Sequence, residues 1–247
     1  MPTVASPVKL YQREMHERLG FFANWLPADP IDVGDVGRLE GGRFRRTSSL
    51  AEFGIETTAE SRGGGQPVEY TSSKGTQVEL GGGAGAAGLA KAEVRVSFSR
   101  TSAFVFHASM LRLLRLSNPA AVARDVVAAY EEGRWEKDWL IVESLHEAEI
   151  ATILVSQDST SELVLCADVS ELLASFSLAD PNIDFSVTSS RGQVVEIIHA
   201  EGVHPLYSCM RVRDPLIGAP SLRPVRGSRA STEAAFARPR IDELLNS

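Results

Sequence analysis

One stretch of the chain alternates between apolar and polar side chains more regularly than any other. In residues 89–100, one side carries Ala90, Ala92, Val94, Val96 and Phe98, and the other carries Lys91, Glu93, Arg95, Ser97 and Ser99. Successive side chains of a β-strand point to opposite faces of a sheet, so this pattern predicts a long strand with one buried and one solvated face. Such alternation is typical of an antiparallel sheet that faces water on one side.

Helices are signalled at two other places. Residues 7–20 carry the apolar stripe Val8, Tyr11, Met15 and Leu19, with Gly20 where a C-terminal cap belongs. Residues 119–132 begin after Asn118 with a proline at the first helical position and end at Gly133. A capping box at residues 168–171 predicts a third, shorter helix that ends near residue 176.

Further strands are predicted at residues 77–80, 103–107, 139–143, 149–156, 162–167, 182–188, 193–200 and 205–213. We expect residues 103–107 to pair back on residues 89–100. Strands before, between and after modest helices indicate the α+β class, with a largely antiparallel β-sheet body, two or three short helices and a C-terminal helical tail. The predicted body is residues 1–220 and the predicted tail is residues 221–247.

Composition and charge restrict the function. With 43% hydrophobic and 23% charged residues, the chain is expected to form an ordinary globular core. Two cysteines form no disulfide framework, and neither a signal peptide nor an apolar run of about 18 residues is found, so we expect a cytoplasmic protein. Of the net charge of −7, the tail contributes +2 and the body therefore −9. That balance argues against nucleic acid as a partner and against simple attraction to anionic lipid, although arginine clusters remain at 43–46 and 112–115.

Known catalytic and binding motifs are incomplete. The run of glycine and alanine at residues 83–88 matches the letters of a dinucleotide fingerprint, but an alternating strand pattern follows where that motif needs a helix. His146 lacks a second histidine four positions later, where Ile150 stands, so a zinc helix is not formed. We therefore expect no cofactor, no metal and no enzymatic activity. An active site assembled from scattered residues, such as His199 and His204 with a carboxylate, stays an open alternative.

Aromatic residues Phe21, Phe22 and Trp25 follow the first predicted helix and allow two interpretations. They close the bottom of the core, which we favour, or they anchor the protein on a partner or membrane.

The tail combines a basic linker with an apolar helical pattern. Proline, glycine and serine separate the arginines from residue 220 to 231, and an exposed linker of this kind is a substrate for a trypsin-like protease. The spacing of the later apolar residues predicts a short helix that docks on the body. The candidate cleavage sites are Arg223, Arg226, Arg229, Arg238 and Arg240, and the candidate docking residues are Phe236, Ile241, Leu244 and Leu245.

A β-rich body followed by a short detachable tail resembles the bacterial gasdermin-type pore-forming proteins. The resemblance implies that a protease removes an inhibitory C-terminal peptide and that strands then extend into amphipathic hairpins which assemble a membrane pore. In this chain the hairpin segments would be residues 89–107 and 149–167, with Ala90, Ala92, Val94, Val96 and Phe98 toward lipid. It also implies a role in cell death or anti-phage defence. Bacterial members carry a lipid-modified cysteine near the N-terminus, whereas the first cysteine here is Cys166.

Two function hypotheses follow. In the first, the chain is a non-enzymatic, autoinhibited pore former whose partners are an activating protease, membrane lipid after activation, and further copies of itself, with the inner membrane as its site after activation. In the second, it is a soluble β-rich binding module with a partner-binding tail. Behaviour toward lipid after tail removal distinguishes them.

Overall fold

In the residues that the structure describes, the fold is mostly antiparallel β-sheet with two α-helices, which confirms the α+β class. This computed structural model describes residues 7–25, 30–72, 74–84, 90–169, 177–179, 183–213 and 219–224. The chain divides into two compact units. Unit 1 comprises Met1–Tyr11, Gly64–Leu111 and Ala148–Val203, and unit 2 comprises Gln12–Gly63, Arg112–Glu147 and His204–Ser247.

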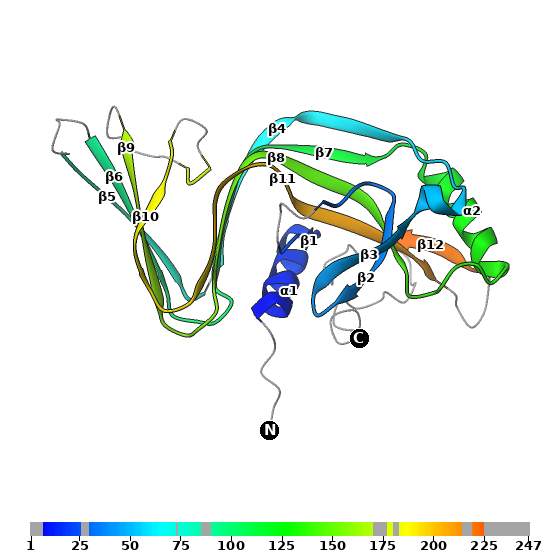
Figure 1. The fold of residues 1–247 in the computed structure, drawn as a ribbon, viewed down its shortest axis with the longest axis horizontal. Helices are drawn as coiled ribbons and strands as arrows, with labels where there is room; N and C mark the ends of the chain where they lie inside the picture. Colours follow the sequence, from blue (N-terminus) through cyan, green and yellow to red (C-terminus); the bar gives the residue numbers. More distant parts are fainter. Residues whose placement is uncertain are drawn as a thin grey trace, which may run out of the picture. The chain divides into compact units, whose positions relative to one another are not determined.

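Figure 1 shows the order of the elements along the chain. The helices are α1 (Pro7–Leu19), the 3₁₀ turn η1 (Leu50–Phe53) and α2 (Pro119–Glu131). The strands are β1 (Phe22–Ala23), β2 (Asp35–Glu40), β3 (Arg43–Ser49), β4 (Ala59–Thr71), β5 (Thr76–Ala84), β6 (Ala90–Phe98), β7 (Phe104–Leu116), β8 (Leu140–Ser156), β9 (Ser161–Val169), β10 (Ser186–Arg191), β11 (Val194–Arg213) and β12 (Ser221–Pro224). Strands β4, β7, β8 and β11 contribute residues to both units.

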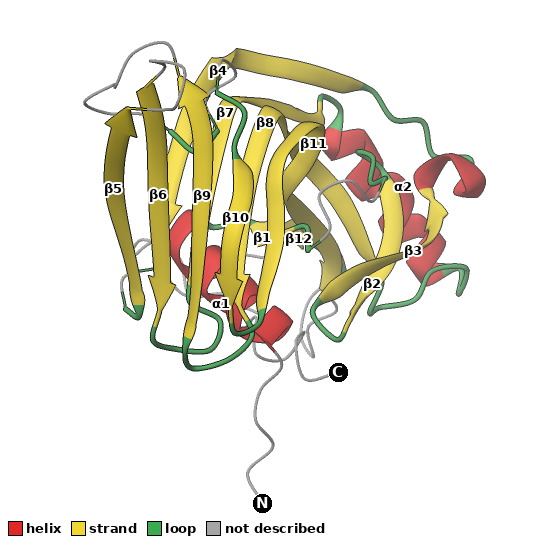
Figure 2. Cartoon of the chain, turned by 60° about the vertical axis from the view of Figure 1, so that its left-hand side comes forward, coloured by secondary structure: helices red, strands yellow, loops and turns green. Residues whose placement is uncertain are grey.

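Unit 1 is built from two layers of sheet. One is a separate four-stranded sheet in the order β10-β9-β6-β5, here called the outer layer, whose strands lie side by side in Figure 2. The other, here called the second layer, consists of the unit 1 portions of β4, β7, β8 and β11. A single apolar cluster joins them, because it contains Val94, Val96 and Phe98 of β6 together with Val105 of β7 and Leu154 of β8. Burial of this cluster is the hydrophobic contribution that holds the layers together.

Unit 2 contains the order β1-β11-β8-β2-β3, with β12 paired to β11. Strand β8 is buried on both faces of this sheet, since its neighbouring residues Leu140 and Ile141 belong to two different apolar clusters. Helix α2 covers one face with Val122, Val126 and Ala129. Asn118 precedes this helix as predicted, but its side chain bonds to the backbone of Glu56 and Thr58 instead of capping the helix.

The region after α1 fits the core interpretation of the early aromatic residues. Phe22 is fully buried and stacks on Tyr207 at 5.5 Å between ring centroids, and Trp25 is 8% exposed. The buried side chain of Gln12 accepts a hydrogen bond from Ala23 N at 2.8 Å and donates one to Gly42 O at 2.9 Å. A single glutamine thus ties β1 to the turn between β2 and β3.

Two predictions about pairing and the tail need correction. Residues 103–107 do not pair back on residues 89–100, because β7 and β6 belong to different sheets. Ser221–Pro224, predicted to be the start of a loose linker, form β12 and pair with β11, and Leu222 is buried against the α2 face. The rest of the predicted tail lies outside the described residues. Of the helix predicted at residues 168–176, only Asp168 and Val169 are described, and they are the end of β9.

Candidate functional site

The two layers of unit 1 have the same strand order. In the chain, β4 leads into β5, β6 into β7, β8 into β9 and β10 into β11. The outer layer has the order β5-β6-β9-β10, and the second layer has the matching order β4-β7-β8-β11. Each pair of consecutive strands therefore represents one long strand that is folded over at a bend.

Hydrogen bonds continue from strand to strand through the four bends. Ser72 N donates to Phe104 O at 2.9 Å, which joins the first bend to the second. Ser102 N donates to Ser156 O at 2.8 Å, and Gln157 N donates to Gln193 O at 2.8 Å. Backbone hydrogen bonds at the bends thus join the two sheets, in the arrangement that four long neighbouring strands would have if each were folded over at one line.

Glycine and serine provide the conformations at this line. Gly75 and Gly192 have φ of +81° and +80°, and Ser102 has φ of +65°. Positive φ is accessible to glycine at little cost and is uncommon for serine. A Cβ atom at residue 192 would lie 2.6 Å from Thr160 O, so only glycine fits there without a shift of the backbone.

Serine hydroxyls also hold the bends closed. Ser72 Oγ lies 2.6 Å from Thr76 Oγ1, and Ser156 Oγ lies 2.6 Å from Ser161 Oγ. Asp158 accepts backbone hydrogen bonds from Gln193 at 2.8 Å and Thr160 at 3.0 Å, and these bonds lower the pKa of its carboxyl group. Each contact joins groups that a straight strand would separate.

The outer layer is apolar toward the second layer and polar on its opposite face. Val94 and Val96 are fully buried and lie directly opposite Leu165 and Leu163 of β9. On the opposite face, Arg95 lies 3.6 Å from Glu93 and 3.9 Å from Glu162, in exposed ion pairs.

The apolar face is incompletely covered at the sheet edges. Val78 and Leu80 of β5 share the register positions of Val96 and Val94, yet they are 38% and 55% exposed. Val187 of β10, opposite Leu165, is 39% exposed. Both edge strands of the outer layer thus present apolar side chains beside unpaired backbone.

Residues 177–179 are hydrogen-bonded to the second layer. Leu178 N donates to His107 Nδ1 at 3.3 Å, and Thr152 Oγ1 donates to Leu178 O at 2.6 Å. Burial lowers the pKa of His107, while Glu69, at 3.8 Å, acts in the opposite direction and more weakly. The neutral imidazole is therefore the form that accepts this hydrogen bond.

The sequence predicts β6 of the outer layer correctly, but it does not predict the bends between the layers. Ala90, Ala92, Val94, Val96 and Phe98 all lie in β6, and their role toward lipid stays a prediction. The predicted hairpin segments 89–107 and 149–167 each contain a bend. The two strands within each segment lie in different layers and pair with other strands of their own layer. Serine carries no strong turn signal in a strand pattern, so Ser72, Ser102 and Ser156 were not identified, whereas Gly75 and Gly192 offered a signal.

The predicted tail residues are mostly outside the described part. Arg223 lies in β12, exposed and opposite Arg211 of β11. The remaining candidates, which are Arg226, Arg229, Phe236, Arg238, Arg240, Ile241, Leu244 and Leu245, lie outside the described residues.

Cofactor and metal sites have no support in the described residues. The glycine and alanine run leads from β5 to β6, strands that pair with one another from Thr76↔Phe98 to Ala84↔Ala90, so β6 follows where a nucleotide fingerprint needs a helix. Across the described residues, no group of three histidine, cysteine or acidic side chains is placed to hold a metal ion. The helices in this part of the chain are too short or too polar to cross a bilayer.

Comparisons with known proteins were positive for solved structures alone. No family model matches the chain, and no curated protein does. Among solved structures, the chain is similar to the cryo-EM structure of the Gasdermin A3 membrane pore, with a TM-score of 0.32 and 12% sequence identity over 87% of this chain and 94% of that one. This is a likeness of backbone course, and it assigns no residue a role.

Proposed function

We propose that the protein is a pore former whose folded four-stranded sheet straightens at its bends and inserts its outer layer into a lipid bilayer. The observation that carries the proposal is the identical strand order on both sides of the bends, with hydrogen bonds that continue across them. Straightening the strands at the bends therefore keeps the order of neighbouring strands, and it changes only the bends and the packing between the two layers.

Three of the four outer strands suit a membrane in length. β5, β6 and β9 each have nine residues, and a spanning strand needs about 9–11, whereas β10 has six. The face that now packs on the second layer would contact lipid. The face with Glu93, Arg95 and Glu162 would stay in water, where its exposed ion pairs already are.

Energetics keep the sheet closed in water and favour opening in lipid. Opening in water exposes the apolar cluster, and each large apolar side chain contributes about 1.5–3 kcal/mol when buried. A bilayer provides the same side chains with a new apolar environment. The free edges of β5 and β10 would then leave backbone groups unpaired in lipid, which is strongly unfavourable, so several copies must join edge to edge.

We further propose that the C-terminal tail inhibits pore formation until a protease removes it. It rests on the basic linker and the apolar spacing of residues 221–247 and on the resemblance to gasdermin-type proteins. Because β12 is paired and Leu222 is buried, cleavage after Arg226 or Arg229 would remove the tail and keep the body complete.

Two lysine substitutions on β5 test the proposal. Vesicles loaded with dye are mixed with the protein before and after limited trypsin treatment. Leu80→Lys places a charge on the proposed lipid face at a site that is already 55% exposed, so folding should persist while leakage falls strongly. Gln77→Lys adds the same charge to the exposed opposite face and should leak like the unmodified protein.

Full leakage by Leu80→Lys would contradict the assignment of the lipid face. Intact vesicles in the presence of cleaved, unmodified protein would favour the soluble binding module.

A further inference from the structure

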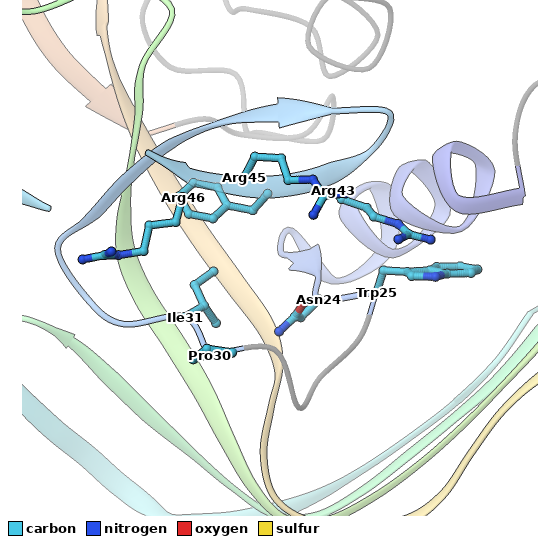
Figure 3. A pocket seen from close by; sticks show the side chains of 8 residues that line it. Asn24, Trp25, Pro30, Ile31, Arg43, Arg45 and Arg46 are labelled. Atoms are coloured by element: carbon cyan, nitrogen blue, oxygen red, sulfur yellow. The ribbon is translucent and has the colours of Figure 1, made fainter. Parts of the chain in front are cut away.

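A hollow of about 290 Å³ lies in unit 2 beside β3 (Figure 3). Strand β3 is the edge of its sheet, so no further strand of the described chain covers this side. In Figure 3, Arg45 reaches over the hollow, Asn24 and Ile31 lie across from it, and Arg46 points away. Arg43 lies 5.7 Å above the ring of Trp25.

The walls of this hollow are fixed by buried contacts. Gln12 binds both Ala23, next to Asn24, and Gly42, next to Arg43. Asn24 N donates to Pro205 O at 2.8 Å. Any side chain at Gly37 would collide with the carbonyl oxygen of Arg45, so this glycine lets β3 lie close to β2. The hollow is therefore held in shape before any ligand arrives, which lowers the entropy lost on binding.

Two of its three arginines form no ion pair with any carboxylate among the described residues. Arg46 lies 2.7 Å from Asp35 and 3.6 Å from Glu52, which neutralise it. In the described part of the chain, no acidic side chain forms an ion pair with Arg43 or Arg45. Arg45 lies opposite another arginine, Arg38, which is paired with Glu136. A body with a net charge of −9 thus places at one hollow two guanidinium groups that no described carboxylate neutralises.

We infer that this hollow binds a phosphate monoester. Two guanidinium groups match the double negative charge of such a group, and their N–H forks match its oxygens. Ile31 lines the hollow across from Arg45 and gives a small apolar contact for the organic part. The volume is at the lower end of ligand pockets, so it suits a small ester and excludes a dinucleotide.

Calorimetric titration of the full chain tests this site with inorganic phosphate, with glycerol phosphate, and with phosphatidylcholine vesicles that contain or lack phosphatidic acid. We expect binding of glycerol phosphate or of the phosphatidic acid vesicles. Arg45→Gln should weaken it about tenfold or more, and the double variant Arg43→Gln/Arg45→Gln should weaken it further. Arg124→Gln on α2 removes the same charge from an exposed site and should change nothing.

The arms of the titration separate the sources of the ester. Binding of glycerol phosphate alone identifies a soluble ligand, and binding of the phosphatidic acid vesicles alone identifies a lipid headgroup; both support the site. Absence of binding in every arm would overturn the inference, as would equal binding by the double variant and the unmodified protein. The inference is independent of pore formation, because these titrations measure binding without leakage.

Discussion

At the scale of single residues, Gly192 shows how the bent state is specified. Its φ of +80° and the nearness of Thr160 O leave no room for a side chain at the bend between β10 and β11. Gly192→Ala should lower the free energy of unfolding by about 1–3 kcal/mol. Gly81→Ala is the matched control in β5, since its new Cβ would meet nothing closer than 3.8 Å.

Urea denaturation of both variants measures this difference. Because a straight strand requires no positive φ, Gly192→Ala should also leak dye faster after cleavage. Equal stability of the two variants would contradict the requirement for glycine at the bend.

His107 makes the stability of unit 1 dependent on pH. Burial holds its pKa below the ordinary value of 6.5, so the unfolded chain binds the proton more readily than the folded chain. The stabilisation is therefore fully present above pH 6.5 and is lost as the pH falls below it, when the Leu178 N–H loses its acceptor.

Unfolding free energies of the unmodified protein and of His107→Gln, measured as a function of pH, check this expectation. The substitution should lessen the loss of stability below pH 6.5. His146, whose pKa burial also lowers beside Phe21, accounts for part of the slope that remains. An unchanged slope in His107→Gln would contradict the role of His107.

At the scale of elements, local sequence patterns predict individual helices and strands, but they do not predict which strands pair with one another. The apolar stripe and Gly20 predict α1, and Pro119 with Gly133 predicts α2, because helix signals are confined to a few neighbouring residues. Alternation likewise predicts β6. The partition of β6 and β7 into different sheets could not be predicted, since it depends on pairing with β9 and β8, which lie dozens of residues away in sequence.

Strand β12 changes the expected pattern of proteolysis. Its backbone is paired with β11, and a protease needs an extended, unpaired segment. Mass spectrometry during brief trypsin treatment should find early cuts after Arg226 or Arg229, beyond β12, and none after Arg211 of β11, whose backbone β12 pairs. The Arg223–Pro224 bond resists trypsin in any conformation, so it reports nothing here. An early fragment that ends at Arg211 would contradict the paired strand.

At the scale of the whole molecule, we propose that the four pairs of consecutive strands exist in two forms, one folded at the bends and one straight. Disulfides across the bends test it, because Oγ atoms that are 2.6 Å apart indicate side chains close enough to be bridged. The staples are Ser72→Cys/Thr76→Cys and Ser156→Cys/Ser161→Cys, in a background with Cys166→Ser and Cys209→Ala. In a straight strand, residues four or five apart are separated by about 13 or 17 Å, beyond the reach of a disulfide.

Ser144→Cys/Ser208→Cys is the matched control. Its hydroxyls are 2.7 Å apart on β8 and β11, which are neighbours in one sheet, so this disulfide crosses no bend.

The most direct measurement is dye leakage from vesicles by the two bend-stapled variants together with this control, after cleavage, before and after reduction. Both bend-stapled variants should cause no leakage while oxidised and full leakage when reduced, whereas the control should leak in both states. Equal leakage by oxidised and reduced bend staples would contradict the straightening of the sheet.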